Sequence, residues 1–80
     1  MWILGIRVEN SPEEVRAIQE ILTKYGCSIR TRLGLHDPED IESGDSRLIL
    51  LQLTGNPEEF PKLEEELMRI GGIQIRKMVF

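Results

Sequence analysis

Two halves of this chain of 80 residues follow the same local plan, and this repetition constrains the fold more than any other feature. Each half contains a strand, a helix that begins with a capping residue and a proline, a glycine where the helix ends, and a second strand. The spacing of apolar residues predicts strands over 2–9, 27–36, 47–54 and 73–80. The predicted order of elements is therefore βαββαβ.

The first strand and the first helix have the clearest signals. Apolar side chains occupy every second position from Trp2 to Val8, which is the period of a strand with one buried face. The sequence SPEE at 11–14 is a capping box with proline at the first helical position, and apolar residues then recur at helical spacing. Gly26 supplies the expected end of this helix.

The second helix has a less regular start. Asn56 is its predicted cap, and Gly71 and Gly72 end it. Pro61 lies inside the apolar pattern, where a proline removes one backbone hydrogen bond. We therefore expect either an irregular first turn or a regular helix that starts at Pro61.

Right-handed crossovers and a hairpin between the two middle strands turn this order into an α+β, ferredoxin-like sandwich. The expected antiparallel sheet has the strand order 4-1-3-2, with both helices on one face. No linker or low-complexity segment divides the sequence, so residues 1–80 are predicted to form a single domain. A chain of this size buries only about 60% of the surface that its unfolded form exposes, which favours self-association.

Charge is distributed unevenly between the predicted elements. The strands carry six basic residues and one acidic residue, whereas the rest of the chain carries four basic and thirteen acidic residues, for a net charge of −4. Strand alternation places four arginines on the sheet face opposite the helices, and Leu48, Leu50 and Gln52 are expected to share it. These arginines are Arg7, Arg30, Arg32 and Arg76. The open side of the sheet is therefore predicted to be basic and partly apolar.

The second strand contains the one irregularity that the sequence signals. Its two sides are expected to hold Cys27, Ile29, Thr31, Leu33 and Leu35 on one side, and Ser28, Arg30, Arg32, Gly34 and His36 on the other. A glycine inside a strand is typical of a bulge. A bulge at Gly34 would reverse the alternation of the residues that follow it.

A sheet face that combines arginines with leucines has two interpretations. It can pack against another subunit, with leucines in the buried centre and arginines paired with carboxylates at the rim, and we favour this interpretation. It can also hold a small anionic metabolite, because arginine forks bind carboxylate and phosphate bidentately. Both interpretations hold if the ligand lies between the subunits of a homodimer or homotetramer.

Nucleic acid is not an expected partner. Domains that bind the phosphate backbone are usually basic, whereas the net charge of this chain is −4. RNA binding by this kind of sheet also requires aromatic residues on the open face of the central strands. The corresponding positions hold Arg7, Leu48, Leu50 and Gln52, and none of these residues is aromatic.

Catalysis and metal binding have few candidate residues. Cys27 and His36 point to opposite sides of their strand unless the bulge intervenes, and the sequence has no second histidine or cysteine to complete a tetrahedral metal site. The acidic segment 37–46 lacks the spacing of a calcium-binding loop. We therefore expect no enzyme activity, no metal site and no cofactor.

The cellular setting follows from cysteine content and hydropathy. A single cysteine fits a reducing, cytoplasmic environment. No apolar run approaches the roughly 18 residues of a membrane helix. The apolar residues 1–4 are followed at once by Gly5 and Arg7, so a signal peptide is not expected. The prediction is a cytoplasmic protein that does not enter the membrane.

The stretch 4–80 resembles a family of small ACT-like proteins described as regulators of the iron-only hydrogenase system. The similar segments are ILGIRVE at 3–9, YG at 25–26, IRTRLGLH at 29–36 and GGIQIRKMVF at 71–80. Within them, the pattern Arg-x-Gly-apolar at 32–35 is the most specific, because the others consist mainly of glycines and apolar spacing.

The resemblance implies an oligomeric regulatory domain. The family is similar to the C-terminal regulatory domain of nickel-responsive repressors and to amino-acid-binding ACT domains, in which effectors lie between subunits near the first strand–helix loop. That loop is 9–12 here, and it lacks the glycine common in amino-acid-binding ACT loops. The chain also lacks the histidine-rich nickel set and a ribbon-helix-helix segment, so any transcriptional role would require a partner.

Our leading hypothesis is a non-enzymatic, ACT-like regulatory or small-ligand-sensing domain that acts as a homo-oligomer. The predicted ligand site combines the first strand–helix loop with the basic second strand of a neighbouring subunit. There the helix N-terminus and polar side chains would donate to an anion, and arginines would supply charge. The predicted ligand-binding residues are Asn10, Ser11, Arg30, Arg32 and His36. The alternative hypothesis is a structural protein–protein assembly module with no ligand.

Overall fold

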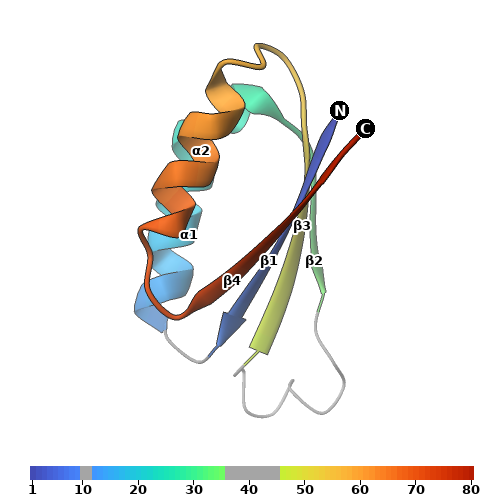
Figure 1. Ribbon diagram of the computed structural model, residues 1–80. Helices are drawn as coiled ribbons and strands as arrows, with labels where there is room; N and C mark the ends of the chain where they lie inside the picture. Colours follow the sequence, from blue (N-terminus) through green and yellow to red (C-terminus); the bar gives the residue numbers. More distant parts are fainter. Residues whose placement is uncertain (10–11, 36–45) are drawn as a thin grey trace.

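The computed structural model describes residues 1–9, 12–35 and 46–80. Within these ranges it contains four strands and two helices in the predicted order (Figure 1). The elements are β1 (Trp2–Glu9), α1 (Pro12–Lys24), β2 (Ile29–Leu35), β3 (Ser46–Leu53), α2 (Glu59–Met68) and β4 (Ile73–Val79). A short 3₁₀ turn, Gly26–Ser28, connects α1 to β2. Across the described residues, neither helix combines the length and the apolar character needed to cross a bilayer.

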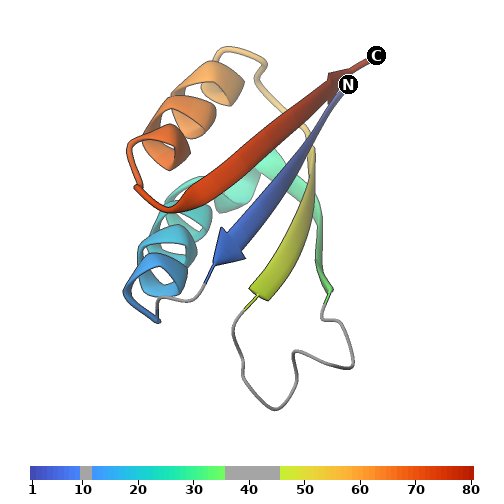
Figure 2. The same ribbon diagram turned by 60° about the horizontal axis from the view of Figure 1, so that its bottom comes forward.

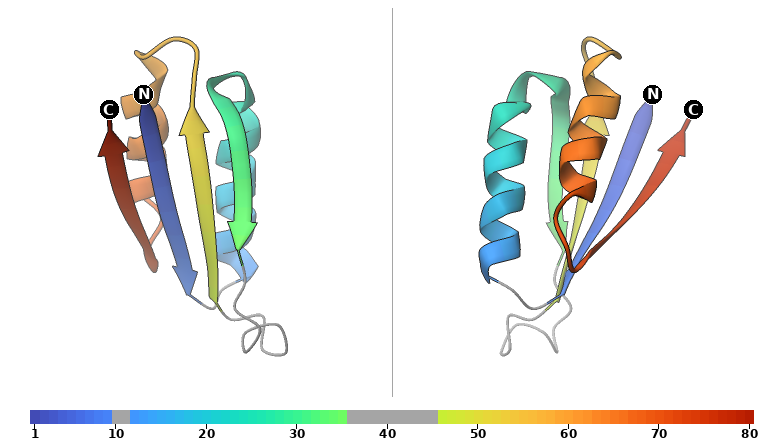
Figure 3. Two further views of the ribbon diagram at one scale, coloured as in Figure 1. Left: turned by 90° about the vertical axis from the view of Figure 1, so that its right-hand side faces the viewer. Right: turned by 60° about the vertical axis from the view of Figure 1, so that its left-hand side comes forward.

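The four strands form one antiparallel sheet in the order β2-β3-β1-β4, which is the predicted order read from the opposite edge. Both helices lie on one face of this sheet, and no described helix lies on the other face (Figures 1 and 3). Figure 2 shows the two helices running side by side along the sheet. The α+β, ferredoxin-like fold is therefore confirmed.

The hydrophobic core lies between the helices and the two central strands. Alternate residues of β1 and β3 supply its sheet side, and residues at helical spacing supply its helix side. The buried apolar residues are Leu4, Ile6, Val8, Ile18, Leu22, Ile49, Leu51, Leu53, Phe60, Leu63 and Leu67. The apolar periods of two and of about 3.6 residues in the sequence thus correspond to one buried strand face and one buried helix stripe.

α2 begins with an irregular turn, which is one of the two expected outcomes. Asn56 Oδ1 accepts a hydrogen bond from the backbone N–H of Glu58 at 3.0 Å, and the Asn56 carbonyl accepts one from Glu59 at 3.0 Å. The regular helix starts at Glu59, so Pro61 falls in its first turn. Backbone N–H groups in the first turn have no partner within the helix, and Pro61 therefore costs α2 no hydrogen bond.

Two glutamates of α2 connect this helix to different parts of the fold. Glu66 accepts hydrogen bonds from Lys24 Nζ, at 3.0 Å, and from the hydroxyl of Tyr25 just beyond α1. Glu64 forms an ion pair of 3.1 Å with Lys77 of β4. The hydrogen bond to Glu66 raises the pKa of Tyr25 to about 12. The hydrogen bonds from Tyr25 and Lys24 in turn lower the pKa of Glu66.

β2 contains an irregularity near its start. Its pairing with β3 moves from Ile29 opposite Leu53 to Thr31 opposite Gln52, which leaves Arg30 as the extra residue of a bulge. The hydroxyl of Thr31 donates a hydrogen bond to Gln52 Oε1 at 3.2 Å, so these two side chains lie on the same face. An extra residue reverses the alternation of the side chains that follow it.

The bulge places apolar rather than basic side chains of β2 on the open side of the sheet. Leu33 faces the open side, whereas Arg32 lies opposite Leu51, which is fully buried beneath the helices. The predicted position of Arg32 on the open side is therefore wrong. The physical reason is the place of the bulge, since the irregular residue is Arg30 and not Gly34.

Candidate assembly and ligand surfaces

The sheet face opposite the helices is an apolar surface with two arginines, and we call it the open face. No described helix covers it (Figure 3). Its members are Met1, Ile3, Arg7, Thr31, Leu33, Leu35, Leu48, Leu50, Gln52, Gln74, Arg76, Met78 and Phe80. Leu33 and Met78 are 49% and 54% exposed. Scattered exposed apolar residues are ordinary, but a contiguous group of this kind is typical of a binding surface.

The first and last residues extend the open face at one end of the sheet. The backbone N–H of Phe80 donates to the Met1 carbonyl at 2.8 Å, and the Met1 amino group donates to the Phe80 carbonyl at 3.1 Å. Both side chains therefore continue the alternation of Ile3 and Met78. The Gln52 amide nitrogen lies 3.6 Å from the sulfur of Met1, which places Met1 on the same face as Gln52.

Arg7 and Arg76 supply the charge of the open face. Arg7 lies between Leu48 of β3 and Gln74 of β4, and Arg76 lies opposite Gly5 of β1. Both arginines are exposed. The prediction that these two residues face away from the helices is confirmed, because β1 and β4 pair without any shift in register. Both arginines of the open face thus lie on β1 and β4, whereas its β2–β3 side is apolar with Thr31 and Gln52.

The structure describes only part of the predicted ligand site. Arg30 and Arg32 are both exposed on β2, with Arg30 at the bulge and Arg32 on the helix side. Asn10, Ser11 and His36 lie outside the described residues.

The positions of β1 and β2 place Arg30 far from the end of β1. β2 begins beside Leu53 of β3 and ends beside Leu48, whereas β1 ends at Glu9, beside Ser46. Arg30 therefore lies at the end of the sheet away from the loop that follows Glu9. The separation along the strands is about 20 Å, which is beyond the reach of one arginine side chain. Arg30 and the end of β1 are therefore not neighbours within one subunit.

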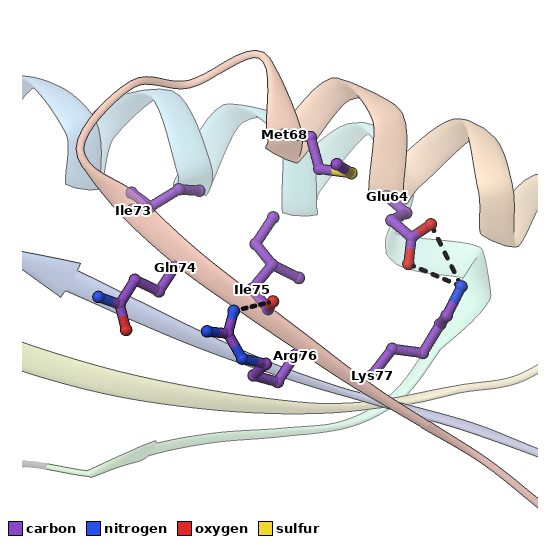
Figure 4. A pocket seen from close by; sticks show the side chains of 7 residues that line it. All are labelled: Glu64, Met68, Ile73, Gln74, Ile75, Arg76 and Lys77. Carbon is purple, nitrogen blue, oxygen red and sulfur yellow. Dashed lines mark hydrogen bonds and ion pairs between the residues drawn. The ribbon is translucent and has the colours of Figure 1, made fainter.

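A groove lies between α2 and the outer edge of β4 (Figure 4). Its volume is about 500 Å³. The lining residues are Glu64, Met68, Ile73, Gln74, Ile75, Arg76 and Lys77. No sequence pattern indicates this groove, because it depends on the spacing between α2 and β4. The apolar Met68, outside the apolar stripe of α2, is the one sequence signal that could have pointed to it.

Side chains for metal binding and nucleophilic chemistry are sparse in the described ranges. Among residues 1–9, 12–35 and 46–80, no three histidine, cysteine, aspartate or glutamate side chains lie close enough to hold a metal ion. Cys27 is a free, exposed thiol. The surfaces that the structure describes therefore offer arginine charge, backbone groups and apolar contact.

Known proteins resemble this chain in structure rather than in sequence. No protein-family model matches the sequence, and no curated protein sequence matches it. An uncharacterized protein from Thermotoga maritima is structurally similar over 96% of this chain and 91% of that chain, with a TM-score of 0.81 and 23% sequence identity. The ACT domain of GTP pyrophosphokinase from Chlorobium tepidum is similar over 95% of this chain and 96% of that chain, with a TM-score of 0.65 and 18% identity.

Part of a larger enzyme has the same architecture. A formyltetrahydrofolate deformylase from Pseudomonas putida is similar over 99% of this chain but only 28% of the enzyme, with a TM-score of 0.68 and 12% identity. All three identities are low, so the similarity concerns the fold alone. The chain has an ACT-like, ferredoxin-like fold.

Proposed function

We propose that this chain is a non-enzymatic regulatory domain that assembles through its open face and responds to a small anionic ligand. The open face is the observation that carries the proposal, because it is a contiguous apolar surface that no described helix covers. The ACT-like fold supports a regulatory role by analogy with ACT domains.

Assembly is the better supported part of the proposal. The bulge at Arg30 adds Leu33 and Leu35 to the exposed apolar residues of the open face. Burial of this surface against a second copy would remove it from water, which is the main driving force of protein association. Arg7 and Arg76 lie toward the opposite side, where pairing with carboxylates at the rim is favourable.

The ligand site is the finer part of the proposal. Arg30 and Arg32 form no ion pair within the described part of the chain, so both guanidinium groups are available to an anion. Together with His36 of the same subunit and with Asn10 and Ser11 of a neighbouring subunit, they would bind a carboxylate or phosphate group. We propose a dimer or tetramer in the cytoplasm, with no cofactor and no contact with nucleic acid or membrane.

The proposed regulatory target is the iron-only hydrogenase system. This step rests on the segments at 3–9, 29–36 and 71–80, which resemble its ACT-like regulators. We propose that any effect on transcription is exerted through a partner protein.

A structural assembly module without a ligand is the second candidate. The position of Arg32 favours it, because this residue lies on the helix side and the open face is correspondingly less basic than expected. The two functions share the interface and differ only in the response to an anion. They can therefore be separated by one measurement of assembly and one of ligand binding.

The assembly is tested by sedimentation velocity at micromolar concentration. The wild-type chain is expected to sediment as a dimer or tetramer, and Leu33→Glu is expected to sediment as a folded monomer because it puts a charge into the buried centre. Met68→Glu is the matched control, since Met68 is also exposed but lies on α2, away from the open face. A monomeric wild-type protein would contradict assembly in both candidate functions.

The ligand is tested by a thermal-shift screen with phosphate, nucleotides and amino acids. A ligand at a hundred times its Kd stabilises the folded state by about 2.7 kcal/mol, which such a screen detects readily. The double variant Arg30→Ala, Arg32→Ala should lose this response while it stays assembled. Arg16→Ala, an exposed arginine of α1, should keep it. If no compound stabilises the wild type, the module without a ligand is the better description.

A further inference from the structure

The backbone of β4 presents unpaired hydrogen-bonding groups along its outer edge. Phe80 and Met1 exchange two backbone hydrogen bonds, of 2.8 and 3.1 Å. In an antiparallel ladder, such hydrogen-bonded pairs alternate with pairs whose N–H and C=O groups point away from each other. The outward-pointing groups of β4 therefore belong to Ile73, Ile75, Lys77 and Val79. No described strand pairs with this edge, so an added strand could bond to these groups.

β4 is a regular edge strand, and this regularity allows a further strand to pair with it. Its pairing with β1 continues without a shift from Trp2 opposite Val79 to Val8 opposite Ile73. Edge strands are commonly protected from further pairing by bulges or by covering segments. β2 has such a bulge at Arg30, whereas β4 has no irregularity over its seven residues.

The groove beside this edge offers space for side chains. Ile73 and Ile75 are half-buried on the helix side of β4, and Met68 of α2 is 67% exposed next to them (Figure 4). A strand added to β4 would point every second side chain toward this groove. A volume of about 500 Å³ accommodates apolar side chains of the size of valine or leucine. The groove therefore favours an added strand with apolar residues at alternate positions.

The charge beside the edge is positive and only partly neutralised. Lys77 Nζ lies 3.1 Å from Glu64 and 4.3 Å from the centre of the Trp2 ring, so it is held on the helix side. Arg76 lies on the open side and forms no ion pair with any described residue. Its Nη1 instead donates to the carbonyl of Ile75 at 2.9 Å, which is one of the outward-pointing acceptors.

We propose that the edge of β4 binds an extended peptide segment that alternates apolar and acidic side chains. The apolar side chains enter the groove beside α2. The acidic side chains lie on the open side and pair with Arg76, which frees the Ile75 carbonyl for the added strand. The partner is thus a strand-forming acidic segment of another protein. This site shares no residue with the proposed ligand site, although Gln74 and Arg76 also belong to the open face. The inference goes beyond the proposed function.

A second copy of this chain fits the same edge less well. Antiparallel pairing of β4 with another β4 brings two copies of Arg76 and Lys77 into one short stretch, and like charges on neighbouring strands destabilise the pairing. Neither copy would supply an acidic residue from β4 to pair with Arg76. Charge complementarity therefore favours the acidic segment.

The probe is a fluorescein-labelled peptide of about nine residues that alternates valine and glutamate, which is long enough to span the seven residues of β4. Fluorescence anisotropy should show saturable binding, and a peptide with lysine in place of glutamate should not bind. Two further peptides carry N-methyl groups on alternate amides, either in the frame of the valine residues or in the frame of the glutamate residues. Because the amides of only one frame point toward β4, the Kd values of the two peptides should differ at least about tenfold.

Protein variants locate the site independently. Arg76→Ala should weaken binding of the valine–glutamate peptide about fivefold, as loss of one exposed ion pair predicts. Val79→Pro should weaken it as well, because it removes an outward N–H, and proline is tolerated where the N–H of an edge strand faces solvent. Arg16→Ala, on α1, should bind like the wild type. Circular dichroism verifies that each variant is folded, and the N-methylated peptides test the same point on the unmodified protein.

Amide hydrogen exchange supplies the residue-level test. Saturating peptide should slow exchange at Ile75 and Lys77 at least about tenfold and leave the amides of β2 unchanged. Binding that does not distinguish the two N-methylated frames, protection of β2 instead of β4, or no binding at millimolar peptide would each overturn the proposal. So would protection of the same amides that grows with protein concentration and ignores the peptide, since the occupant would then be a second copy. Leu33→Glu should bind the peptide normally, so failure of assembly and failure of this site are distinguishable.

Discussion

The two edges of the sheet, β2 and β4, differ in regularity, and the difference has consequences for both faces of the molecule. At β2, the extra residue Arg30 interrupts the ladder with β3 and reverses the side-chain alternation, which brings Leu33 to the open face. At β4, pairing with β1 is uninterrupted, so Arg76 keeps the predicted side and the outer backbone stays available. One inserted residue therefore changes which side chains of a strand lie on each face of the sheet. It also changes how well the edge of the strand can accept another strand.

The two edges are also anchored differently by α2. Glu66 reaches toward the segment before β2, through Lys24 and Tyr25, and Glu64 reaches to Lys77 on β4 itself. The first link joins helix to helix, whereas the second joins helix to edge strand. The ion pair between Glu64 and Lys77 contacts β4 on the side that faces the helices. The outer edge of the strand therefore stays open beside the groove.

The largest expected difference between the edges is in amide hydrogen exchange of the isolated protein. Along β4, the amides of Gln74 and Arg76 bond to β1, whereas those of Ile75 and Lys77 point outward. The inward amides should exchange at least about a hundredfold more slowly, because they open only with the sheet. Along β2, this alternation should be interrupted at Arg30. Uniform protection along β4 at low protein concentration would show that its edge is already covered.

The glycines that precede the two edge strands should respond differently to substitution. Gly72, before β4, has φ +79°, and a Cβ there would overlap the carboxylate of Glu14. Gly72→Ala should therefore lower the free energy of unfolding by about 2 kcal/mol, as expected for a strained backbone. Gly26, before β2, has no atom within 4 Å of its would-be Cβ, so Gly26→Ala should change stability by less than about 0.5 kcal/mol.

Urea denaturation of both glycine variants at one protein concentration measures this contrast, since an oligomer makes the midpoint depend on concentration. Gly71→Ala is a useful control, because Gly71 is next to Gly72 but has no close neighbour and no positive φ. Equal losses at Gly71 and Gly72 would contradict the explanation from backbone strain and the Glu14 contact.

Lys77, which anchors β4, should contribute more to stability than Lys24 at the end of α1. Lys77 is 36% exposed, pairs with Glu64 and lies over the Trp2 ring, so Lys77→Ala should cost about 1 kcal/mol. Lys24 is 63% exposed in its pair with Glu66, where solvent screens the attraction, and Lys24→Ala should cost less. Thermal unfolding of the two variants compares them directly. A larger loss for Lys24→Ala would show that the helix–helix link dominates.

The stability that the Glu66 contacts between α1 and α2 provide should depend weakly on pH in the acidic range. Hydrogen bonds from Tyr25 and Lys24 lower the pKa of Glu66 from its ordinary 4.5. The stabilisation is therefore fully present above that ordinary value and is lost as the pH falls through the folded pKa. Glu66→Gln should be less stable than the wild type at neutral pH and should approach it in strong acid. Urea midpoints measured at a series of pH values provide the comparison, and a constant difference would contradict it.

Ionisation of Tyr25 at alkaline pH tests its hydrogen bond to Glu66. The hydrogen bond to Glu66 raises the pKa of Tyr25 from 10.0 to about 12, and this residue is the only tyrosine in the chain. Its contribution to stability is present below the unfolded pKa and is lost as the pH rises through the folded pKa. Absorbance titration should show late ionisation in the folded wild type and earlier ionisation in Glu66→Gln. Ionisation near 10 in both proteins would mean that the hydrogen bond does not form in solution.

Sequence patterns predicted the fold well and the surfaces less well. Pro12 and the glycine pair at 71–72 marked the start of α1 and the end of α2, because such signals act within a few residues of a helix end. The alternation of β2 was predicted wrongly, since Gly34 was the visible signal and Arg30 carries the bulge. The ligand site at Asn10 and its partners stays a prediction, because it joins a loop to a strand of another subunit.

The sequence by itself determined the order βαββαβ, the core faces of β1 and β3, and the division of charge between strands and helices. These features follow from local periodicity and capping, which each segment expresses without reference to the others. Only the tertiary structure decided the bulge at Arg30, the composition of the open face, and the groove beside β4. Their common physical cause is pairing between segments far apart in the chain, where register and helix placement are set by the fit of the whole core.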